Sequence, residues 1–410
     1  LSVNHDWWGT WLTYVGYILL YLSMIGIFFI GKTRFKDLSK KLNKINIKKQ
    51  SISVLLLLFT FGINPLKAQN HAHNQTAPLD FDSIIQADAF SLNHAEKFGA
   101  LIIQDAGGRM KPANTFSSEL LRKVSKSDTY KGLNSDQVLL SIMNNPAVWY
   151  NVPMVYLKRG NDSLRRLTGT GPKAKYAALL SFFDAEGNYK IAPQLEEAYL
   201  ASVPNQFQKD FIEVDKRVNL LYSALEGKIM RIFPIPDDPN NKWVSYPELS
   251  EANFKGKDSL YVRNILPLYF QSLRLAQQDK DYAQAENLLE SIHGFQKKFG
   301  NQVLPSEDKV KAEMLYNKYD IFKKLFSWYL YAGTLFFLLL IIQIFKSNKL
   351  ISYCVSGFKV LMLLLFLLHT GGLAARWFIS GHAPWSDAYE SMIYVAWATQ
   401  FFGLVFGRKS

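Results

Sequence analysis

The chain has 410 residues, of which 49% are hydrophobic and 20% charged, and it carries a formal net charge of +13. This mixture is too apolar for a disordered chain, and the length is enough for two or three folding units. Most of the basic excess lies in short segments outside the long central stretch, residues 67–324. This distribution argues against a nucleic-acid surface and indicates that the charge encodes orientation in a membrane.

The ends of the chain and its single cysteine limit what it can be. The first residue is Leu1 rather than Met, so we interpret the chain as a piece of a longer protein. Cys354 lies in an apolar segment and is the only cysteine. The sequence therefore has no disulfide framework, no Cys-x-x-Cys metal or redox site and no Cys-x-x-Cys-His haem attachment site, and it is not itself a c-type cytochrome. We predict no resident metal site.

Long apolar runs are the strongest signal along the chain. Four of them approach the roughly 20 residues that a membrane helix needs. They are residues 11–30, 325–345, 351–373 and 392–406, the last of which can be extended back to Tyr389. A fifth run, residues 52–63, is shorter and follows two lysines, as in a signal peptide. Whether residues 51–68 form a short span or a cleaved signal stays open.

Basic residues predict the orientation of these segments. Residues 31–50 contain eight basic side chains and one acid, Asp37, and basic loops remain in the cytoplasm. The predicted fold class is therefore mainly α, with about five membrane helices and a large, mostly helical domain outside the cytoplasm. The predicted divisions are 1–66, two membrane segments joined by a basic cytoplasmic loop; 67–79, a linker; 80–323, the outer domain; and 324–410, three membrane segments.

The outer domain has local signals of helices and turns. Helical spacing of apolar residues predicts helices over 117–124, 135–143, 175–183 and most of 262–323. Residues 184–188 are typical of a turn, and Ser306 before two acids predicts a helix start. Residues 110–115, which follow Gly107 and Gly108, are expected to form a loop; the glycines do not match a phosphate-binding loop.

The most specific string is residues 380–391, where an outer loop enters the last apolar run. It combines His382, a candidate axial haem ligand, with the aromatic plane of Trp385 and an Asp387-x-x-Glu390 spacing that can cap a helix. An alternative explanation is structural, because Trp and Tyr are common at membrane interfaces and Asp387 would cap any helix.

Two further residues precede this loop. His369 lies inside an apolar run, where an ionisable group tends to face a bundle interior and to be functional. The following Thr370-Gly371-Gly372 is predicted to open the helix locally, which would let water or backbone satisfy a purely structural imidazole. Arg376 could attract haem propionates or could simply anchor the helix at the interface.

The other histidines carry weaker signals. His5 lies beside tryptophans that an interfacial belt explains, and His71 and His73 form a pair without a third metal ligand. His94 and His293 lie in helical contexts and are interpreted as ordinary core or surface residues.

Several strings resemble one family. GHAPWSDAYESMIYVAW, residues 381–397, resembles the CcsA-like half of System II cytochrome c synthases, where a Gly-His-x-Pro-x-Ser-x-x-Tyr-Glu-Ser signature precedes a membrane helix. Residues 6–29 resemble the last span of the ResB-like half, and residues 108–124 and 305–325 are similar to the outer domain of fused versions. The residues that match the signature, besides His382, are Gly381, Pro384, Ser386, Tyr389, Glu390 and Ser391.

The resemblance implies cytochrome c biogenesis, in which haem is delivered to the outer face and attached covalently to apocytochrome c. Haem is the expected cofactor of the complete protein. Apocytochrome c, membrane lipid and a thiol-reducing protein are the expected partners, without nucleic acid. The implied location is the bacterial inner membrane, with several spans and the large domain in the periplasm.

The resemblance also has a gap. The family's tryptophan-rich haem segment is not in the sequence. A haem-lyase type of synthase is thus expected of the complete protein, whereas this piece alone is expected to be inactive and to hold haem weakly. No catalytic residue is assigned, and His382, His369, Trp385 and Arg376 are the candidates for haem contact.

Two alternatives remain open at this stage. One is a membrane transporter of haem or of another anionic amphiphile that does not attach it. The other is a membrane sensor whose outer domain binds a protein.

Overall fold

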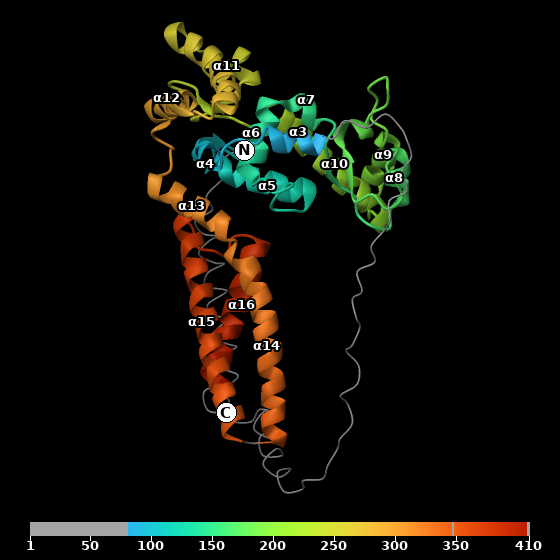
Figure 1. Ribbon diagram of the computed structural model, residues 1–410, viewed down its shortest axis with the longest axis vertical. Helices are drawn as coiled ribbons and strands as arrows, with labels where there is room; N and C mark the ends of the chain where they lie inside the picture. Colours follow the sequence, from blue (N-terminus) through green and yellow to red (C-terminus); the bar gives the residue numbers. More distant parts are fainter. Residues whose placement is uncertain (1–80, 347, 408–410) are drawn as a thin grey trace. The chain divides into compact units, whose positions relative to one another are not determined.

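The computed structural model describes residues 81–346 and 348–407, which belong to one compact unit spanning Gln75–Ser410. The two apolar runs before residue 81, the basic loop, the linker, His5, His71 and His73 lie outside the described residues. In the part that is described the chain is mainly helical, as predicted (Figure 1). It also contains short antiparallel strand pairs.

The helices and strands fall into a domain before residue 301, called the outer domain after its predicted location, a connecting helix, α13, and three long helices that follow it. The first half of the outer domain contains α3 (Phe81–Ala87), α4 (Leu92–Gly99), β1 (Ile102–Gln104), β2 (Met110–Pro112), α5 (Ala113–Ser125), α6 (Ser135–Asn144), α7 (Pro146–Trp149), β3 (Pro153–Tyr156) and α8 (Asp162–Leu167). The second half contains β4 (Tyr176–Ala178), η1 (Leu179–Phe182), α9 (Ala192–Leu200), α10 (Gln206–Leu225), β5 (Phe233–Pro234), β6 (Trp243–Val244), η2 (Pro247–Ser250), α11 (Gly256–Asp279) and α12 (Ala283–Gly300). The helices α13 (Glu307–Tyr319), α14 (Ile321–Phe345), α15 (Lys349–Ser380) and α16 (Ala388–Phe406) complete the chain.

The prediction of a loop over residues 110–115 is wrong. Met110–Pro112 forms strand β2, which pairs with β1 across a tight turn, and residues 113–115 already belong to α5. The turn is stabilised by Asp105, whose carboxylate accepts hydrogen bonds from the backbone N–H groups of Gly107 and Arg109 at 2.9 and 3.0 Å. The two glycines therefore lie in the turn of a β-hairpin. The hairpin was not predicted because a strand of three residues is too short to show an alternating pattern of side chains.

The prediction of a helix over residues 175–183 is wrong as well. Tyr176–Ala178 is strand β4, which pairs antiparallel with β3, and the next four residues form the 3-10 turn η1. A short apolar run does not distinguish a strand from a helix, and pairing with β3 decides the outcome. The turn predicted after it is present, since Asp184 N–H donates to Asn188 O at 3.0 Å.

The helices predicted over 117–124, 135–143 and most of 262–323 are confirmed as α5, α6 and α11 to α13. The predicted start of α13 is confirmed as well, because the Ser306 hydroxyl accepts a hydrogen bond from Lys309 N–H. That helix ends at Tyr319. The next residue, Asp320, adopts a left-handed conformation with φ +42°, and α14 begins directly after it. The chain thus changes direction between the outer domain and the long apolar helix.

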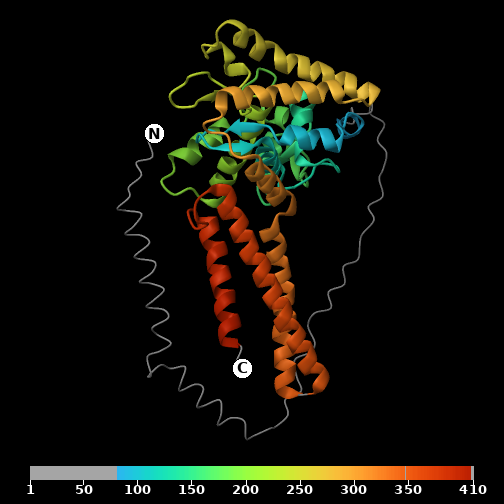
Figure 2. The ribbon, with the colours of Figure 1, turned by 90° about the vertical axis from the view of Figure 1, so that its left-hand side faces the viewer.

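The three helices α14, α15 and α16 lie side by side (Figures 1 and 2). Two helical segments of the described residues, Glu307–Phe345 and Lys349–Ser380, are long and apolar enough to cross a membrane. Only 11% of each apolar window is buried, which is far less than a core helix of a soluble protein requires. Membrane crossing by α16 remains a prediction.

The glycine pair in α15 does not open the helix, contrary to the prediction. The helix runs without interruption from Lys349 to Ser380. A Cβ atom at Gly372 would lie 3.1 Å from the ring of Phe322 on α14. Gly372 therefore permits close packing of two helices, which is a common use of glycine between apolar helices.

Candidate functional site

The signature loop, residues 381–387, is fixed at both ends by helix caps. Gly381 ends α15 in a left-handed conformation, φ +74°, which an L side chain adopts only with strain, and its N–H donates to Trp377 O at 2.9 Å. Asp387 begins α16, where its carboxylate accepts the Glu390 N–H at 2.7 Å. The cap predicted from the Asp387-x-x-Glu390 spacing is confirmed.

Glu390 is the buried acid of this region, with 3% of its surface exposed. Its carboxylate accepts the Ser386 N–H at 2.9 Å and the Arg376 Nε–H at 2.7 Å. Arg376 also lies 5.4 Å above the ring of Tyr389. Arg376 therefore already has a carboxylate partner, and binding a haem propionate would require it to share or exchange that partner.

His382 is exposed on the loop, and the hydrogen bonds of its ring are made by Nδ1. This atom lies 3.2 Å from Ala383 O and 3.0 Å from Ser386 Oγ. In the tautomer with the proton on Nδ1, this atom donates to the Ala383 carbonyl oxygen, which can only accept. The other ring nitrogen, Nε2, then carries the lone pair, which is the form in which an imidazole binds a metal.

His369 has a different environment. It lies on α15 with 4% of its surface exposed, against the rings of Phe322 and Tyr329 of α14 at centroid distances of 5.4 and 5.9 Å. Neither ring nitrogen has a hydrogen bond of ordinary geometry within the described residues, although the ring lies beside the backbone of Ile393. The predicted interior position is confirmed, and the backbone of Ile393 is the group that would satisfy the imidazole if its role is purely structural.

Trp385 belongs to a series of aromatic rings that sequence reasoning did not single out. Its ring lies 5.3 Å from that of Tyr394, which is 5.6 Å from Trp397, and Trp397 is 5.9 Å from Phe401. Phe366 of α15 packs on Trp397 at 5.6 Å. We call these five residues the aromatic ladder. The spacing of 394, 397 and 401 on one helix face could have predicted it.

The structure brings most of the predicted residues together and leaves others apart. Hydrogen bonds join Arg376, Glu390, Ser386 and His382. The Ser391 hydroxyl donates to Trp385 O at 3.3 Å. His369 lies seven residues before Arg376, about 10 Å along the helix at 1.5 Å per residue. Sequence reasoning missed Tyr316 of α13, whose hydroxyl is 3.5 Å from Arg376 Nη1.

The remaining histidines of the described residues lie in the outer domain. His94 is completely buried and His293 is half-buried, in agreement with their interpretation as ordinary residues.

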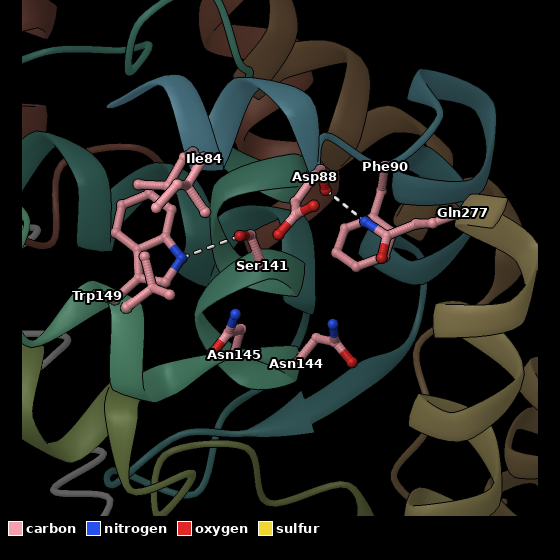
Figure 3. Close-up of a pocket in the computed structure, with 10 residues that line it drawn as sticks. Ile84, Asp88, Phe90, Ser141, Asn144, Asn145, Trp149 and Gln277 are labelled. Atoms are coloured by element: carbon pink, nitrogen blue, oxygen red, sulfur yellow. Dashed lines mark hydrogen bonds between the residues drawn. The ribbon is translucent and has the colours of Figure 1, made fainter. Parts of the chain in front are cut away.

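The outer domain contains three cavities, and they are lined by other residues than those of this site. The one in Figure 3 has a volume of about 10 Å³, room for about one water molecule. The indole N–H of Trp149 donates to Ser141 Oγ on its wall, as the dashed line shows. The buried Asn144 Oδ1 has no hydrogen-bond partner among the described residues, and a water in the cavity could supply one. The other two measure about 170 and 360 Å³ and are lined by residues of the outer domain. None of the three is lined by the predicted haem-contact residues.

No family model matches the chain. Curated proteins do. Along its whole length the chain is 33% identical to Protein NrfI of Wolinella succinogenes, of which it covers 44%. A segment of 58 residues, 14% of the chain, is 43% identical to cytochrome c biogenesis protein CcsA of Lotus japonicus and covers 18% of it. A segment of 86 residues is 36% identical to the CcsA protein of Aethionema cordifolium, covering 20% of the chain and 25% of that protein.

The chain thus resembles System II cytochrome c synthases along its length and not only in its motifs. The resemblance found in its motifs is thereby confirmed, and cytochrome c biogenesis is its general field of function. The chain spans less than half the length of NrfI and about a fifth of the CcsA proteins. The specific role of the chain in cytochrome c biogenesis is therefore a proposal.

Proposed function

We propose that the complete protein delivers haem to the outer face of the bacterial inner membrane and assists its covalent attachment to apocytochrome c. In this proposal haem is the substrate, and the segment from His369 to Glu390 handles it. The loop geometry supports the assignment, because the exposed His382 makes its ring hydrogen bonds through Nδ1, and the tautomer protonated there presents Nε2 to a ligand. This arrangement of His382 is the observation that carries the proposal.

The residues around His382 suit a planar, amphipathic, anionic molecule. The aromatic ladder starts on the same loop, at Trp385, and offers ring faces on which a porphyrin could pack. Attachment joins each cysteine sulfur of the apocytochrome to a vinyl carbon of haem while the thiol proton goes to the neighbouring carbon. The thiols must therefore be reduced beforehand, which is why a thiol-reducing protein belongs among the proposed partners.

The membrane location is part of the same proposal. Large apolar side chains of α14 and α15, such as Phe345 and Leu350, are exposed to 80% and 70% and would face lipid. The proposed arrangement has several spans, with the outer domain in the periplasm. Charge supports this orientation, since Lys346 and Lys349 connect α14 to α15 at the end away from the signature loop.

The test is maturation of a reporter cytochrome with a Cys-x-x-Cys-His site, co-expressed with the complete protein. His382→Ala is expected to lower covalent haem on the reporter about tenfold or more. Loss of a group that only supports a metal ligand already has an effect of about this size. His369→Ala is also expected to lower it. The matched control is His293→Ala, because this half-buried histidine lies on α12, among Glu290, Lys297 and Glu307.

Wild-type maturation by His382→Ala, at equal protein level, would refute the role of this residue in haem handling. A haem spectrum of the purified complete protein separates the proposal from the sensor alternative. Covalent attachment to the reporter separates it from the transporter.

A further inference from the structure

The buried acid Glu390 connects the signature loop to the helices behind it. Its two carboxylate oxygens take different partners: Oε1 accepts from Arg376 Nε and Oε2 accepts from Ser386 N–H. A carboxylate with 3% exposure needs such partners, because an unpaired buried charge is costly. Glu390 thus links α15 and the loop at the first turn of α16.

Ser386 continues this connection to His382. While its N–H donates to Glu390, its hydroxyl lies 3.0 Å from His382 Nδ1. Only two hydrogen bonds therefore separate the carboxylate of Glu390 from the imidazole. The orientation of the ring depends on Ser386, and the place of Ser386 depends on Glu390.

Arg376 connects the same group to the outer domain through α13. Its Nη1 lies 3.5 Å from the hydroxyl of Tyr316, and its Nη2 lies 3.9 Å from Asp387 Oδ2. The planar guanidinium can serve these partners together with Glu390 because its donors form a rigid fork. Lysine, with one ammonium group, could not reproduce this geometry.

The residues of α13 on either side of Tyr316 bind the outer domain. Glu313 Oε1 accepts from the Thr115 hydroxyl at 2.8 Å and from Arg109 Nη2 at 2.9 Å. Asn317 Nδ2 donates to Asn114 Oδ1 at 3.0 Å. Within the five residues 313–317, helix α13 is therefore hydrogen-bonded to Arg109, to α5 and to Arg376.

We propose that Arg376 and Glu390 are positioning residues that hold the loop of residues 381–387, and that Tyr316 makes the order of this loop depend on the docking of the outer domain on α13. Arg376 acts here on the loop and not on a haem propionate. The consequence for haem rests on the function proposed above; the positioning itself does not.

The test uses the complete protein with Cys354→Ser and a nitroxide spin label on Ala383→Cys. Electron paramagnetic resonance reports the nanosecond mobility of the loop without haem. Glu390→Ala and Arg376→Lys are expected to remove most of the immobile component of the spectrum. Tyr316→Phe is expected to reduce it. Matched controls are Tyr319→Phe, which removes an exposed hydroxyl from the same helix, and Glu307→Gln, which removes an exposed carboxylate.

Each outcome decides a part of the inference. Unchanged spectra in Arg376→Lys and Glu390→Ala, with circular dichroism like the parent, overturn the positioning role. An unchanged spectrum in Tyr316→Phe alone overturns the dependence on α13. Increased mobility together with a loss of reporter maturation of about tenfold supports the whole inference. Increased mobility with normal maturation supports the positioning role and refutes the haem function of the loop.

Discussion

His94 shows how a single buried side chain makes the stability of the outer domain depend on pH. The ring is completely buried between Tyr269 and Tyr282, and its Nε2 lies 2.9 Å from the Tyr269 hydroxyl. Burial lowers the pKa of His94 to about 4, although the nearby Glu286 opposes the shift. The folded protein therefore keeps this imidazole neutral, and the Tyr269 hydroxyl can donate to it.

The pKa shift of His94 predicts a stability change with a definite sign. Between pH 6.5 and pH 4 the unfolded chain binds a proton that the folded chain does not, so the free energy of unfolding falls as the pH falls through this window. The loss should reach about 3 kcal/mol by pH 4. Denaturant unfolding of the protein at several pH values measures it. His94→Gln should flatten the curve in this window, whereas His293→Gln should retain most of the slope; equal slopes in His94→Gln and the parent would contradict the assignment.

At the scale of elements, the sequence correctly predicts helix starts, because these depend on residues close together in the chain. The start of α13 at Ser306 and the cap of α16 by Asp387 depend on residues three positions apart, and both predictions are confirmed. Strand β4 was predicted as part of a helix because its partner β3 lies about twenty residues away and is not visible in the local pattern. Where local propensity does not distinguish a strand from a helix, pairing with a distant strand thus determines the structure.

The packing of α12 provides an element-scale prediction. A Cβ atom at Gly300 would overlap the indole of Trp243 in β6, whereas a Cβ at the exposed Gly294 of the same helix would meet no atom within 4 Å. Gly300→Ala is therefore expected to destabilise the protein by about 1–3 kcal/mol. Gly294→Ala should stabilise it by about 0.5–1 kcal/mol through its better helix propensity. Thermal unfolding of both variants measures the difference, and similar melting temperatures would show that α12 is not packed closely on β6.

At the scale of the whole molecule, the candidate site was predictable only in part. The signature loop could be identified because its residues are contiguous and its caps are local. The contact of Arg376 with Tyr316 of α13 joins residues sixty positions apart, and neither apolar spacing nor a local motif indicates it. The same holds for Glu313, which joins α13 to Thr115 and Arg109. The connection of the outer domain to the loop is therefore a product of tertiary structure.

The orientation of the chain is the remaining whole-molecule prediction. Eight basic residues in 31–50 should hold this segment in the cytoplasm, and the outer domain should then lie on the opposite side of the membrane. Cysteines are introduced singly at Lys41 and at Asn240, an exposed residue before strand β6, in a Cys354→Ser background because Cys354 is itself exposed. An impermeant thiol reagent should label position 240 in intact spheroplasts and position 41 only after lysis. Equal labelling of both before lysis would reject this orientation, and with it the proposal that the loop carrying His382 faces the compartment in which apocytochromes receive haem.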